Sequence, residues 1–211
     1  VNPKRLQVNA FAANNPAGFG LMQRDRSFYS YEDLESRYEL RPGIWVEPRG
    51  KWGAGRVELV QLPTPDETND NVVAFWVPAT PPNAKEPFDF EYRLLWQKEK
   101  EAAPPQAWVT QTRRGMGYAR RGEQSAAFMI DFEGPALKKL PPDARIQGVF
   151  SSDANGQILE SIAYRHDVTG GWRVALRVKR ADDRKPVELR GFLRNGSETL
   201  SETWTYTLAV D

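Results

Sequence analysis

The stretch Val57–Trp76, VELVQLPTPDETNDNVVAFW, contains two strand-like runs that flank a polar segment. The first run is Val57–Leu62, and the second extends from Asn71 to Val77. Short apolar runs bounded by Pro, Asp and Asn are typical of β-strands joined by a turn. In the first run, residues of both alternating faces are apolar, which suits the interior of a sandwich better than a free edge. This stretch therefore predicts a β-fold with an acidic loop at one end.

Composition supports a β-rich chain that folds around a packed core. The sequence has 211 residues, 40% of them hydrophobic, and its 16 glycines and 16 prolines divide it into short segments. Many short segments joined by turns predict an all-β fold. The net charge of +1 offers no general attraction to nucleic acid or to anionic lipid, so we expect no nucleic-acid partner. Since no apolar run approaches the roughly 20 residues of a membrane helix, none is expected.

A change of composition marks a domain boundary near the middle of the chain. Residues 98–107 are first charged and then rich in Ala and Pro, as in a linker. We therefore predict one domain over residues 1–97 and a second over residues 108–211. In the first domain, strands are also expected near Leu6–Ala10 and over Phe88–Trp96, with one helical turn at Tyr31–Glu35.

The second domain is predicted to be an immunoglobulin-like sandwich of seven short strands. The best hairpin signal of the chain is Asn155-Gly156, which stands between two apolar runs. One helical turn is expected at Pro135–Leu140. The seven predicted strands are Trp108–Thr112, Ser125–Phe132, Ile146–Ser151, Ile158–Arg165, Gly171–Lys179, Val187–Leu193 and Thr203–Val210.

Several common catalytic machineries lack their residues in this sequence. There is no cysteine, and His166 is the sole histidine, so neither a thiolate nucleophile nor a cluster of Cys and His ligands is available. We expect no metal and no cofactor. His166 is interpreted as an ordinary surface residue, because no G-x-S-x-G nucleophile motif accompanies it.

The remaining candidates are carboxylates, aromatic rings and arginines. Hydrolysis of a glycosidic bond needs one carboxylic acid with a raised pKa and a second carboxylate that activates water or attacks. Asp66, Glu67 and Asp70 place three such groups in one turn, and the residue pattern leaves open both the choice among them and a merely solvated turn. Planar guanidinium groups bind hydroxyls, and aromatic faces suit sugar rings. Such groups are frequent between Arg24 and Trp52.

Several longer segments of the sequence resemble those of a known protein family. The segments Tyr38-Glu39-Leu40-Arg41-Pro42, Trp45-Val46-Glu47-Pro48 and Asn69-Asp70-Asn71-Val72-Val73 run in the order found in the periplasmic glucans biosynthesis family (OpgG/MdoG and its paralogue OpgD). The sequence resembles this family over essentially its whole length. Further matching segments are Gly18–Arg24, Tyr31–Asp33, Trp52-Gly53, Val60–Thr64, Trp108–Arg114, Asp131-Phe132 and Leu200–Tyr206.

The resemblance implies a fold, a compartment and a substrate. Members are periplasmic proteins needed to make osmoregulated glucans with a β-1,2-linked glucose backbone. Their fold is a large β-sandwich, a short linker and an immunoglobulin-like domain, so residues 1–97 would be the C-terminal part of the large sandwich. An enzyme is the favoured expectation, either a glycoside hydrolase of the endo-β-1,2-glucanase kind or a transglycosylase. The alternative is a non-catalytic glucan-binding or scaffold protein in backbone synthesis and export.

The resemblance also assigns roles to residues. The family's proposed general acid corresponds to Asp70, which selects it from the three carboxylates and leaves Glu67 as a supporting neighbour. Tyr38 corresponds to a tyrosine near the cleavage subsites, and Asp33 and Arg41 lie in the same cleft-lining stretch. Arg24 completes the predicted substrate-binding set. The loop 115–124 corresponds to one that in some members helps to close the cleft.

The resemblance places the second carboxylate, the general base, before the first residue of this chain. The sequence opens with VNPKRLQVNAF and without an initiator Met, so we interpret it as part of a longer protein. The missing N-terminal half is accordingly an expected partner. The others are β-1,2-glucan, the inner-membrane glucan glucosyltransferase and a second copy in a homodimer.

Overall fold

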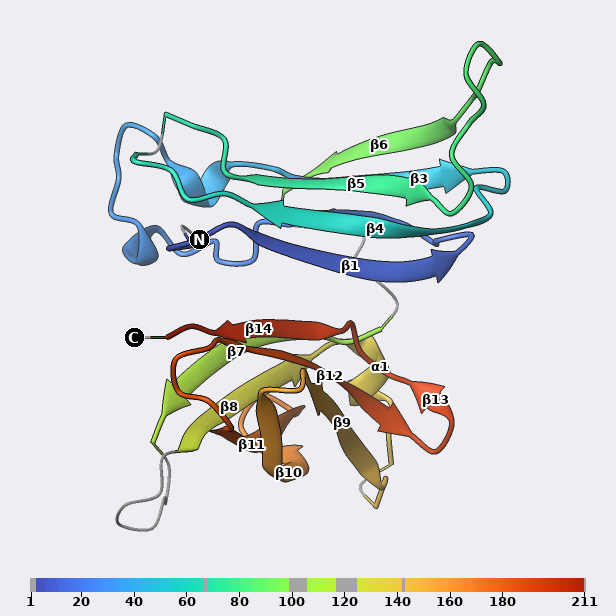
Figure 1. Ribbon diagram of the computed structural model, residues 1–211. Coiled ribbons are helices and arrows are strands. Elements are labelled where there is room, and N and C mark those ends of the chain that lie inside the picture. Colours follow the sequence, from blue (N-terminus) through green and yellow to red (C-terminus); the bar gives the residue numbers. More distant parts are fainter. Residues whose placement is uncertain (1–2, 67, 99–105, 117–124, 142, 211) are drawn as a thin grey trace. The chain divides into compact units, whose positions relative to one another are not determined.

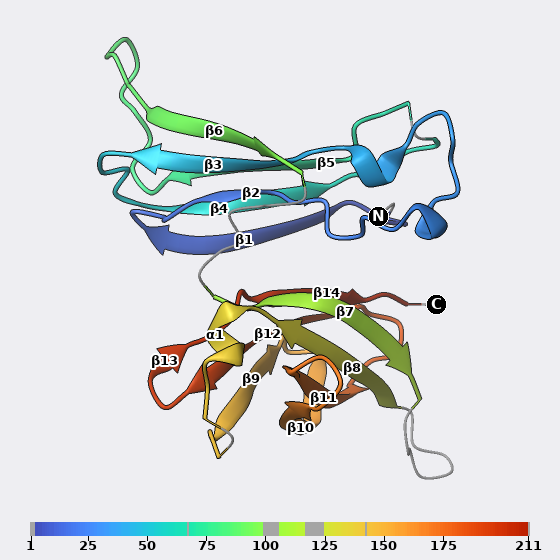
Figure 2. The same ribbon diagram turned by 180° about the vertical axis from the view of Figure 1, so that it is seen from behind.

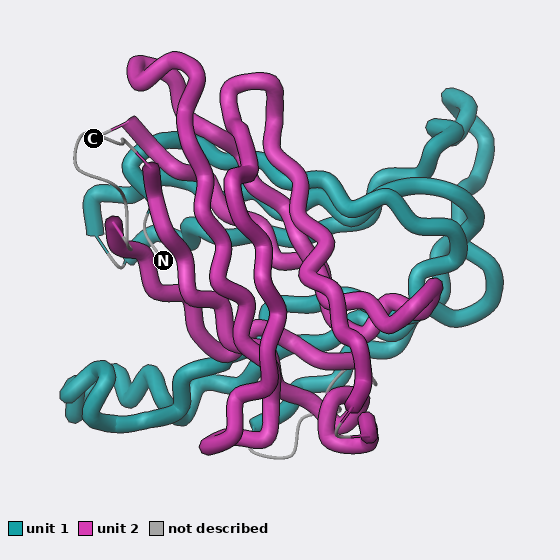
Figure 3. The backbone as a smooth tube through the Cα atoms, turned by 90° about the horizontal axis from the view of Figure 1, so that it is seen from below, with its two compact units in different colours: residues 1–102 teal, residues 103–211 magenta. Residues whose placement is uncertain are grey.

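The protein, as a computed structural model, is nearly all β and divides into two compact units (Figures 1 and 3). The structure describes residues 3–66, 68–98, 106–116, 125–141 and 143–210. The first unit comprises residues 1–102 and the second residues 103–211. The all-β fold predicted from the sequence is confirmed.

The first unit contains two three-stranded antiparallel sheets. One sheet has the order β1-β4-β5 and the other the order β2-β3-β6. Strand β4 is the central strand of its sheet, in keeping with the apolar residues on both its faces. The strands are β1 (Gln7–Asn14), β2 (Phe19–Leu21), β3 (Gly43–Arg49), β4 (Ala54–Gln61), β5 (Val72–Pro78) and β6 (Glu91–Gln97).

Aromatic rings connect the two sheets of the first unit. Trp52, in the β3–β4 turn, lies 6.0 Å from Trp76 of β5 and 6.3 Å from Phe19 of β2, measured between ring centroids. It also lies 4.8 Å from the ring of Phe90. This explains why the strand predicted over Phe88–Trp96 begins only at Glu91: the ring of Phe90 packs on Trp52 and Phe88, and β3 ends at Arg49, the partner of Glu91.

One face of the sheet β2-β3-β6 is apolar and incompletely covered. In an antiparallel sheet, directly paired residues point to the same side. Tyr92, Leu94 and Trp96 of β6 pair with Pro48, Val46 and Ile44 of β3. Tyr92 is 52% exposed and Trp96 67% exposed, and the buried Val, Leu, Ile, Phe and Trp side chains among the described residues all belong to the second unit.

The second unit has a core of its own between two antiparallel sheets. One sheet has the order β10-β11-β8-β7, and in the other β12 pairs with β9, β13 and β14. Phe128, Ile130, Val174 and Leu193 are completely buried in this core. The strands are β7 (Trp108–Gly115), β8 (Ser125–Glu133), β9 (Ile146–Ser152), β10 (Gly156–His166), β11 (Gly171–Arg180), β12 (Val187–Asn195), β13 (Glu198–Thr199) and β14 (Trp204–Leu208).

Each of the seven strands predicted for the second unit overlaps an observed strand, and the short β13 is additional. The one-turn helix predicted at Pro135–Leu140 is α1 (Pro135–Lys138). The immunoglobulin-like topology stays a prediction, as does the exact domain division. Of the predicted linker, residues 99–105 lie outside the described part of the chain.

The prediction of a hairpin at Asn155-Gly156 is wrong. The strands on its two sides belong to different sheets, since β9 pairs with β12 and β10 pairs with β11. Within the described part of the second unit, a two-residue hairpin lies at Gly196, where Asn195 pairs with Glu198. Gly196 has a φ of 56°, the left-handed conformation that two-residue hairpins require and that glycine adopts readily.

The helical turn expected at Tyr31–Glu35 is displaced. The segment instead holds parts of two α-turns: the N–H of Glu32 donates to the carbonyl of Phe28 at 2.8 Å, and the N–H of Arg37 donates to the carbonyl of Asp33 at 3.3 Å. Two short 3₁₀ turns flank the segment, η1 (Phe28–Ser30) and η2 (Tyr38–Leu40). Within the described ranges, no helix has the length and hydropathy needed to cross a membrane.

Candidate functional site

The loop between β4 and β5 is closed at its base and capped by Asp66. The N–H of Leu62 donates to the carbonyl of Asn71 at 2.7 Å. The carboxylate of Asp66 accepts the backbone N–H of Thr68 at 3.0 Å and its hydroxyl at 2.6 Å. These hydrogen bonds, first that of the hydroxyl and then that of the backbone, lower the pKa of Asp66. Asp66 thus shapes the loop.

Asp70 stands on the same loop, two residues before β5 begins, and its side chain is exposed. Among the described residues, no hydrogen bond or ion pair holds its carboxylate. Glu67, the proposed supporting neighbour, lies outside the described residues. The described part of the loop therefore presents Asp70 as a carboxylate without a bond, whereas Asp66 stabilises the conformation of the loop itself.

A second polar cluster is built on the connection from β2 to β3. The guanidinium carbon of Arg41 lies 4.4 Å from the ring centroid of Tyr38, which is a cation–π distance. The ring of Tyr31 lies 5.8 Å from that of Tyr38. These three residues form the tyrosine–arginine cluster. Two of them, Tyr38 and Arg41, were predicted as substrate-binding residues, and the structure brings them into contact.

Tyr31 anchors the tyrosine–arginine cluster to the preceding loop. Its hydroxyl donates to the carbonyl of Asp25 at 3.0 Å and accepts from Nε2 of Gln23 at 2.7 Å. Burial, and next the negative charge of Asp25, raise the pKa of Tyr31. The pKa of Asp25 is lowered, first by the backbone N–H of Ser27 and then by the hydroxyl of Ser30. Tyr31 thus remains a neutral hydrogen-bonding group.

Asp33 and Arg24 were also predicted to bind substrate, but they do not belong to the tyrosine–arginine cluster. The carboxylate of Asp33 accepts the backbone N–H groups of Glu35 at 2.9 Å and of Ser36 at 2.7 Å. Asp33 therefore caps the turn that leads into η2. Arg24 is exposed in the loop after β2. The hydrogen bonds of the Asp33 carboxylate go to the backbone of its own turn and not to Tyr38.

Sequence reasoning missed the groups that hold η2 in place. Nε of Arg37 lies 2.6 Å from Oε1 of Glu39, whose side chain is 5% exposed. Nη1 of Arg26 donates to the carbonyls of Glu39 at 3.2 Å and of Arg41 at 2.8 Å. Nothing in the sequence marks Glu39 as buried, since its neighbours are a tyrosine and an exposed leucine.

The loop with Asp70 and the connection with the tyrosine–arginine cluster lie at the same end of the first unit. Figures 1 and 2 show the β4–β5 loop and the two 3₁₀ turns at this end from opposite sides. Among the described residues, no hydrogen bond or ion pair joins Asp70 to Tyr38 or Arg41. This end of the unit therefore holds an exposed carboxylate and the tyrosine–arginine cluster, which share no direct bond in the described part of the chain.

The second unit has an ion-pair network on the sheet β10-β11-β8-β7. Asp131 accepts from Nε and Nη2 of Arg173 at 2.6 and 2.9 Å, and from Nη1 of Arg113 at 2.9 Å. Nη2 of Arg173 also lies 3.1 Å from Nε2 of His166. The lone histidine is therefore part of a structural network that links the four strands β7, β8, β10 and β11.

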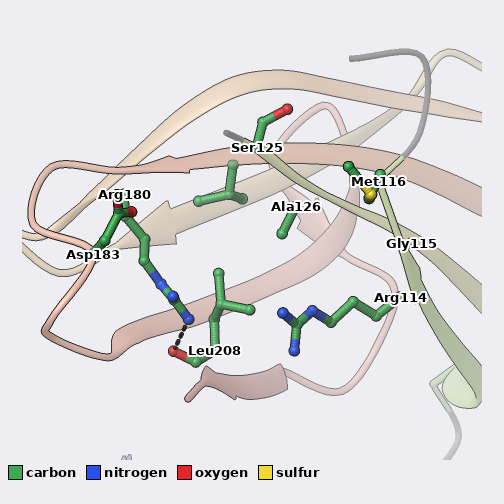
Figure 4. A pocket seen from close by; sticks show the side chains of 9 residues that line it. Arg114, Gly115, Met116, Ser125, Ala126, Arg180, Asp183 and Leu208 are labelled. Carbon is green, nitrogen blue, oxygen red and sulfur yellow. Dashed lines mark hydrogen bonds between the residues drawn. The ribbon is translucent and has the colours of Figure 1, made fainter. Parts of the chain in front are cut away.

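A pocket of about 480 Å³ opens at the end of the second unit (Figure 4). Its floor includes the buried core residues Val178 and Leu208, and Arg114, Arg180 and Asp183 stand around it. Nη2 of Arg180 donates to the carbonyl of Leu208 at 3.0 Å, so this guanidinium is engaged by the backbone. Gly115 and Met116, the first residues of the loop predicted to help close the cleft, also line this pocket. Residues 117–124 of that loop lie outside the described part of the chain.

Comparison with known proteins gives a consistent result. The family model described as "Periplasmic glucan biosynthesis protein, MdoG" matches residues 1–208. A protein named glucans biosynthesis protein G from Ralstonia nicotianae is 61% identical over 213 aligned residues, which cover 98% of this chain and 42% of the relative. Proteins of the same name from Pseudomonas aeruginosa and Serratia proteamaculans are 49% and 48% identical, again over 42% of their length. The chain thus spans about two fifths of these curated relatives.

Proposed function

Because the chain belongs to the periplasmic glucan biosynthesis protein family, we propose that it acts on the β-1,2-linked glucan backbone in the making of periplasmic glucans. Its compartment is the periplasm, which the family description names. The reaction we propose is cleavage or rearrangement of β-1,2-glucan, as by an endo-glucanase or a transglycosylase. Asp70 would donate the proton to the leaving oxygen.

The position of Asp70 carries the proposal of a catalytic acid. A general acid must reach the glycosidic oxygen of a bound chain. Asp70 is exposed on a loop whose conformation is set by Asp66, and no described contact draws its carboxylate away. Water activation needs a second carboxylate, about 6.5–9.5 Å away in the usual inverting geometry. We place that base outside this chain, in the part of the relatives that it does not span.

Substrate binding is assigned to the tyrosine–arginine cluster. A guanidinium held over an aromatic ring has its donors fixed in one plane, ready for the hydroxyls of a sugar. Tyr38 and Arg41 lie at the end of the first unit that also holds the Asp70 loop (Figures 1 and 2). We include Asp33, Arg24 and Glu67 in the binding region, Asp33 as the cap of the turn before η2.

We further propose that the first unit is the C-terminal part of a larger glucan-acting sandwich. A sandwich needs two layers that cover each other's apolar faces. The apolar face with Tyr92, Leu94 and Trp96 is half exposed, which supports a second layer from outside residues 1–97. The second unit would be the immunoglobulin-like domain. The inner-membrane glucosyltransferase and a homodimer remain proposed partners.

A non-catalytic glucan-binding or scaffold role is the second candidate. It is favoured by the exposure of Tyr92 and Trp96, because such rings offer stacking faces to a sugar chain without any acid. In that case the tyrosine–arginine cluster and the β6 rings would guide a nascent glucan, and Asp70 would have no chemical part.

The test is Asp70→Asn in the full-length protein, assayed for new reducing ends on β-1,2-glucan. We expect cleavage to be abolished while circular dichroism and the melting temperature stay unchanged. Cleavage at the wild-type rate would refute the role of Asp70. A wild-type protein that binds glucan without releasing reducing ends or forming rearranged products would favour the scaffold role.

A further inference from the structure

The turn that presents Tyr38 and Arg41 is held by a buried carboxylate, Glu39. Its side chain is 5% exposed, and it forms an ion pair of 2.6 Å with Nε of Arg37. The second carboxylate oxygen, Oε2, is buried and has no hydrogen-bond partner among the residues that the structure describes. A charged oxygen removed from water without a partner costs free energy. An ion pair with this defect contributes little to stability, and its main effect is on the geometry of the turn.

The ion pair fixes an unusual backbone conformation. Arg37 has φ 45° and ψ 55°, the left-handed region, which is uncommon for a residue with a long side chain. It is the residue directly before η2, and its carbonyl accepts the N–H of Leu40 at 2.9 Å. The conformation of Arg37 therefore sets the direction in which Tyr38 leaves the turn. Its guanidinium, bound to Glu39, also lies 5.7 Å from the ring centroid of Phe28.

A second arginine holds the same turn from its other end. Nη1 of Arg26 donates to the carbonyls of Glu39 and Arg41, and the N–H of Arg41 donates to the carbonyl of Tyr38 at 3.1 Å. Glu39 is thus the residue between the two that were assigned to substrate. Its side chain is tied to one arginine and its carbonyl to another.

We propose that Glu39, together with Arg37, is a positioning residue that sets the geometry of Tyr38 and Arg41 for the glucan. The inference rests on the proposed function of the tyrosine–arginine cluster. Since Oε2 of Glu39 is buried, the carboxylate acts through the turn and does not touch the sugar. Its loss should weaken glucan binding and leave the proton transfer by Asp70 nearly unchanged.

The experiment uses the full-length protein and linear β-1,2-gluco-oligosaccharides. Glu39→Ala should raise KM roughly tenfold and change kcat by less than about twofold. Misplaced binding groups weaken the ground state and the transition state equally, so the barrier from the bound complex stays the same. Calorimetry in the Asp70→Asn background should show a similar loss of affinity without turnover. In an Arg41→Ala background, Glu39→Ala should add less than about twofold, since both changes act through the same contact.

The chain offers a matched control. Nε of Arg56 lies 2.6 Å from Oε1 of Glu58, with the same spacing of two residues, on strand β4. Glu58→Ala should leave both KM and affinity unchanged. Should Glu39→Ala fail to fold, Arg37→Asn carries the test, because the Arg37 side chain is 46% exposed and Asn tolerates the left-handed conformation. It should raise KM as Glu39→Ala does.

The outcomes separate this inference from the proposed function. Wild-type KM and affinity in the folded variants would overturn the positioning role, as would full additivity with Arg41→Ala or an equal loss after Glu58→Ala. If the folded wild-type protein neither binds nor cleaves the oligosaccharides, the proposed function itself fails.

Discussion

Arg173 and Asp131 face each other across β11 and β8, and the guanidinium donates to both carboxylate oxygens, at 2.6 and 2.9 Å. Asp131 is 7% exposed and also accepts from Arg113. Burial alone would raise the pKa of Asp131, but the hydrogen bonds from Arg173 and Arg113 outweigh it, and the pKa is lowered. The carboxylate is therefore held in its charged form in the folded protein.

We expect Asp131→Asn to lower the free energy of unfolding by about 1–3 kcal/mol at neutral pH, because two arginines lose their charged acceptor. Since the folded pKa lies below the usual value, this stabilisation is complete above that value and is lost as the pH falls below about 4. Urea unfolding of the wild type and the variant from pH 7 to pH 3 measures the effect. The difference between the two proteins should shrink with acidification, and a constant difference would contradict the assignment. Glu160→Gln removes a more exposed pair with Arg177 on the same sheet and should cost less than about 0.5 kcal/mol.

A second prediction concerns the close packing of Gly191 on Phe150. A Cβ at Gly191 of β12 would overlap the ring of Phe150, on the paired strand β9. Gly191→Ala should destabilise the second unit by about 1–3 kcal/mol, since the ring must move in a filled core. Thermal or urea unfolding measures this loss. Phe150→Leu alone should also destabilise, but in the Gly191→Ala background it should restore part of the stability. Strictly additive losses would show that the overlap is not the cause.

A third prediction separates the two carboxylates of the β4–β5 loop. Asp66→Ala removes the acceptor for Thr68 and should reduce glucan cleavage by roughly three- to tenfold, because the loop that carries Asp70 is less well defined. Asp66→Asn keeps an acceptor oxygen and should stay close to the wild type. Initial rates of reducing-end formation measure both variants. If Asp66→Asn were as inactive as Asp70→Asn, then the charge of Asp66 would take part in the chemistry.

The fourth prediction tests the contact of Arg41 with Tyr38. Arg41→Ala should weaken binding of β-1,2-gluco-oligosaccharides by about 1 kcal/mol or more, because both the cation–π contact and the guanidinium donors are lost. Tyr38→Phe keeps the ring under the guanidinium and loses only the hydroxyl, so its effect should be smaller. Calorimetric titration gives both affinities. Equal losses would indicate that the tyrosine hydroxyl, and not the stacked pair, binds the sugar.

Local patterns predicted strands well and long-range pairing poorly. Short apolar runs separated by turns marked the seven strands of the second unit, because such runs depend only on residues that are close in sequence. The hairpin predicted at Asn155-Gly156 does not form, because the Asn155 side chain binds the backbone of a different turn. Its Nδ2 donates to the carbonyls of Asp182, Lys185 and Pro186, each at 3.1 Å, and ties one turn to another about 30 positions away.

The candidate site shows the same limit. The family resemblance singled out Asp70, Tyr38 and Arg41 from local segments. In the structure, the guanidinium carbon of Arg41 lies 4.4 Å from the ring centroid of Tyr38. Glu39 escaped notice because its burial depends on Arg26 and Arg37, which reach it through side-chain contacts that no spacing encodes. The role of Asp70 stays a prediction.

The half-covered face of β6 also affects how the sequences of the two units evolve. The second unit packs its own core, so compensating substitutions for a change at Leu193 lie within residues 107–208. Tyr92, Leu94 and Trp96 contribute to no such core. A change of volume at these three positions has to be matched by whatever residues cover them. We therefore expect them to covary with positions elsewhere in the full-length relatives, whereas the core positions of the second unit covary among themselves.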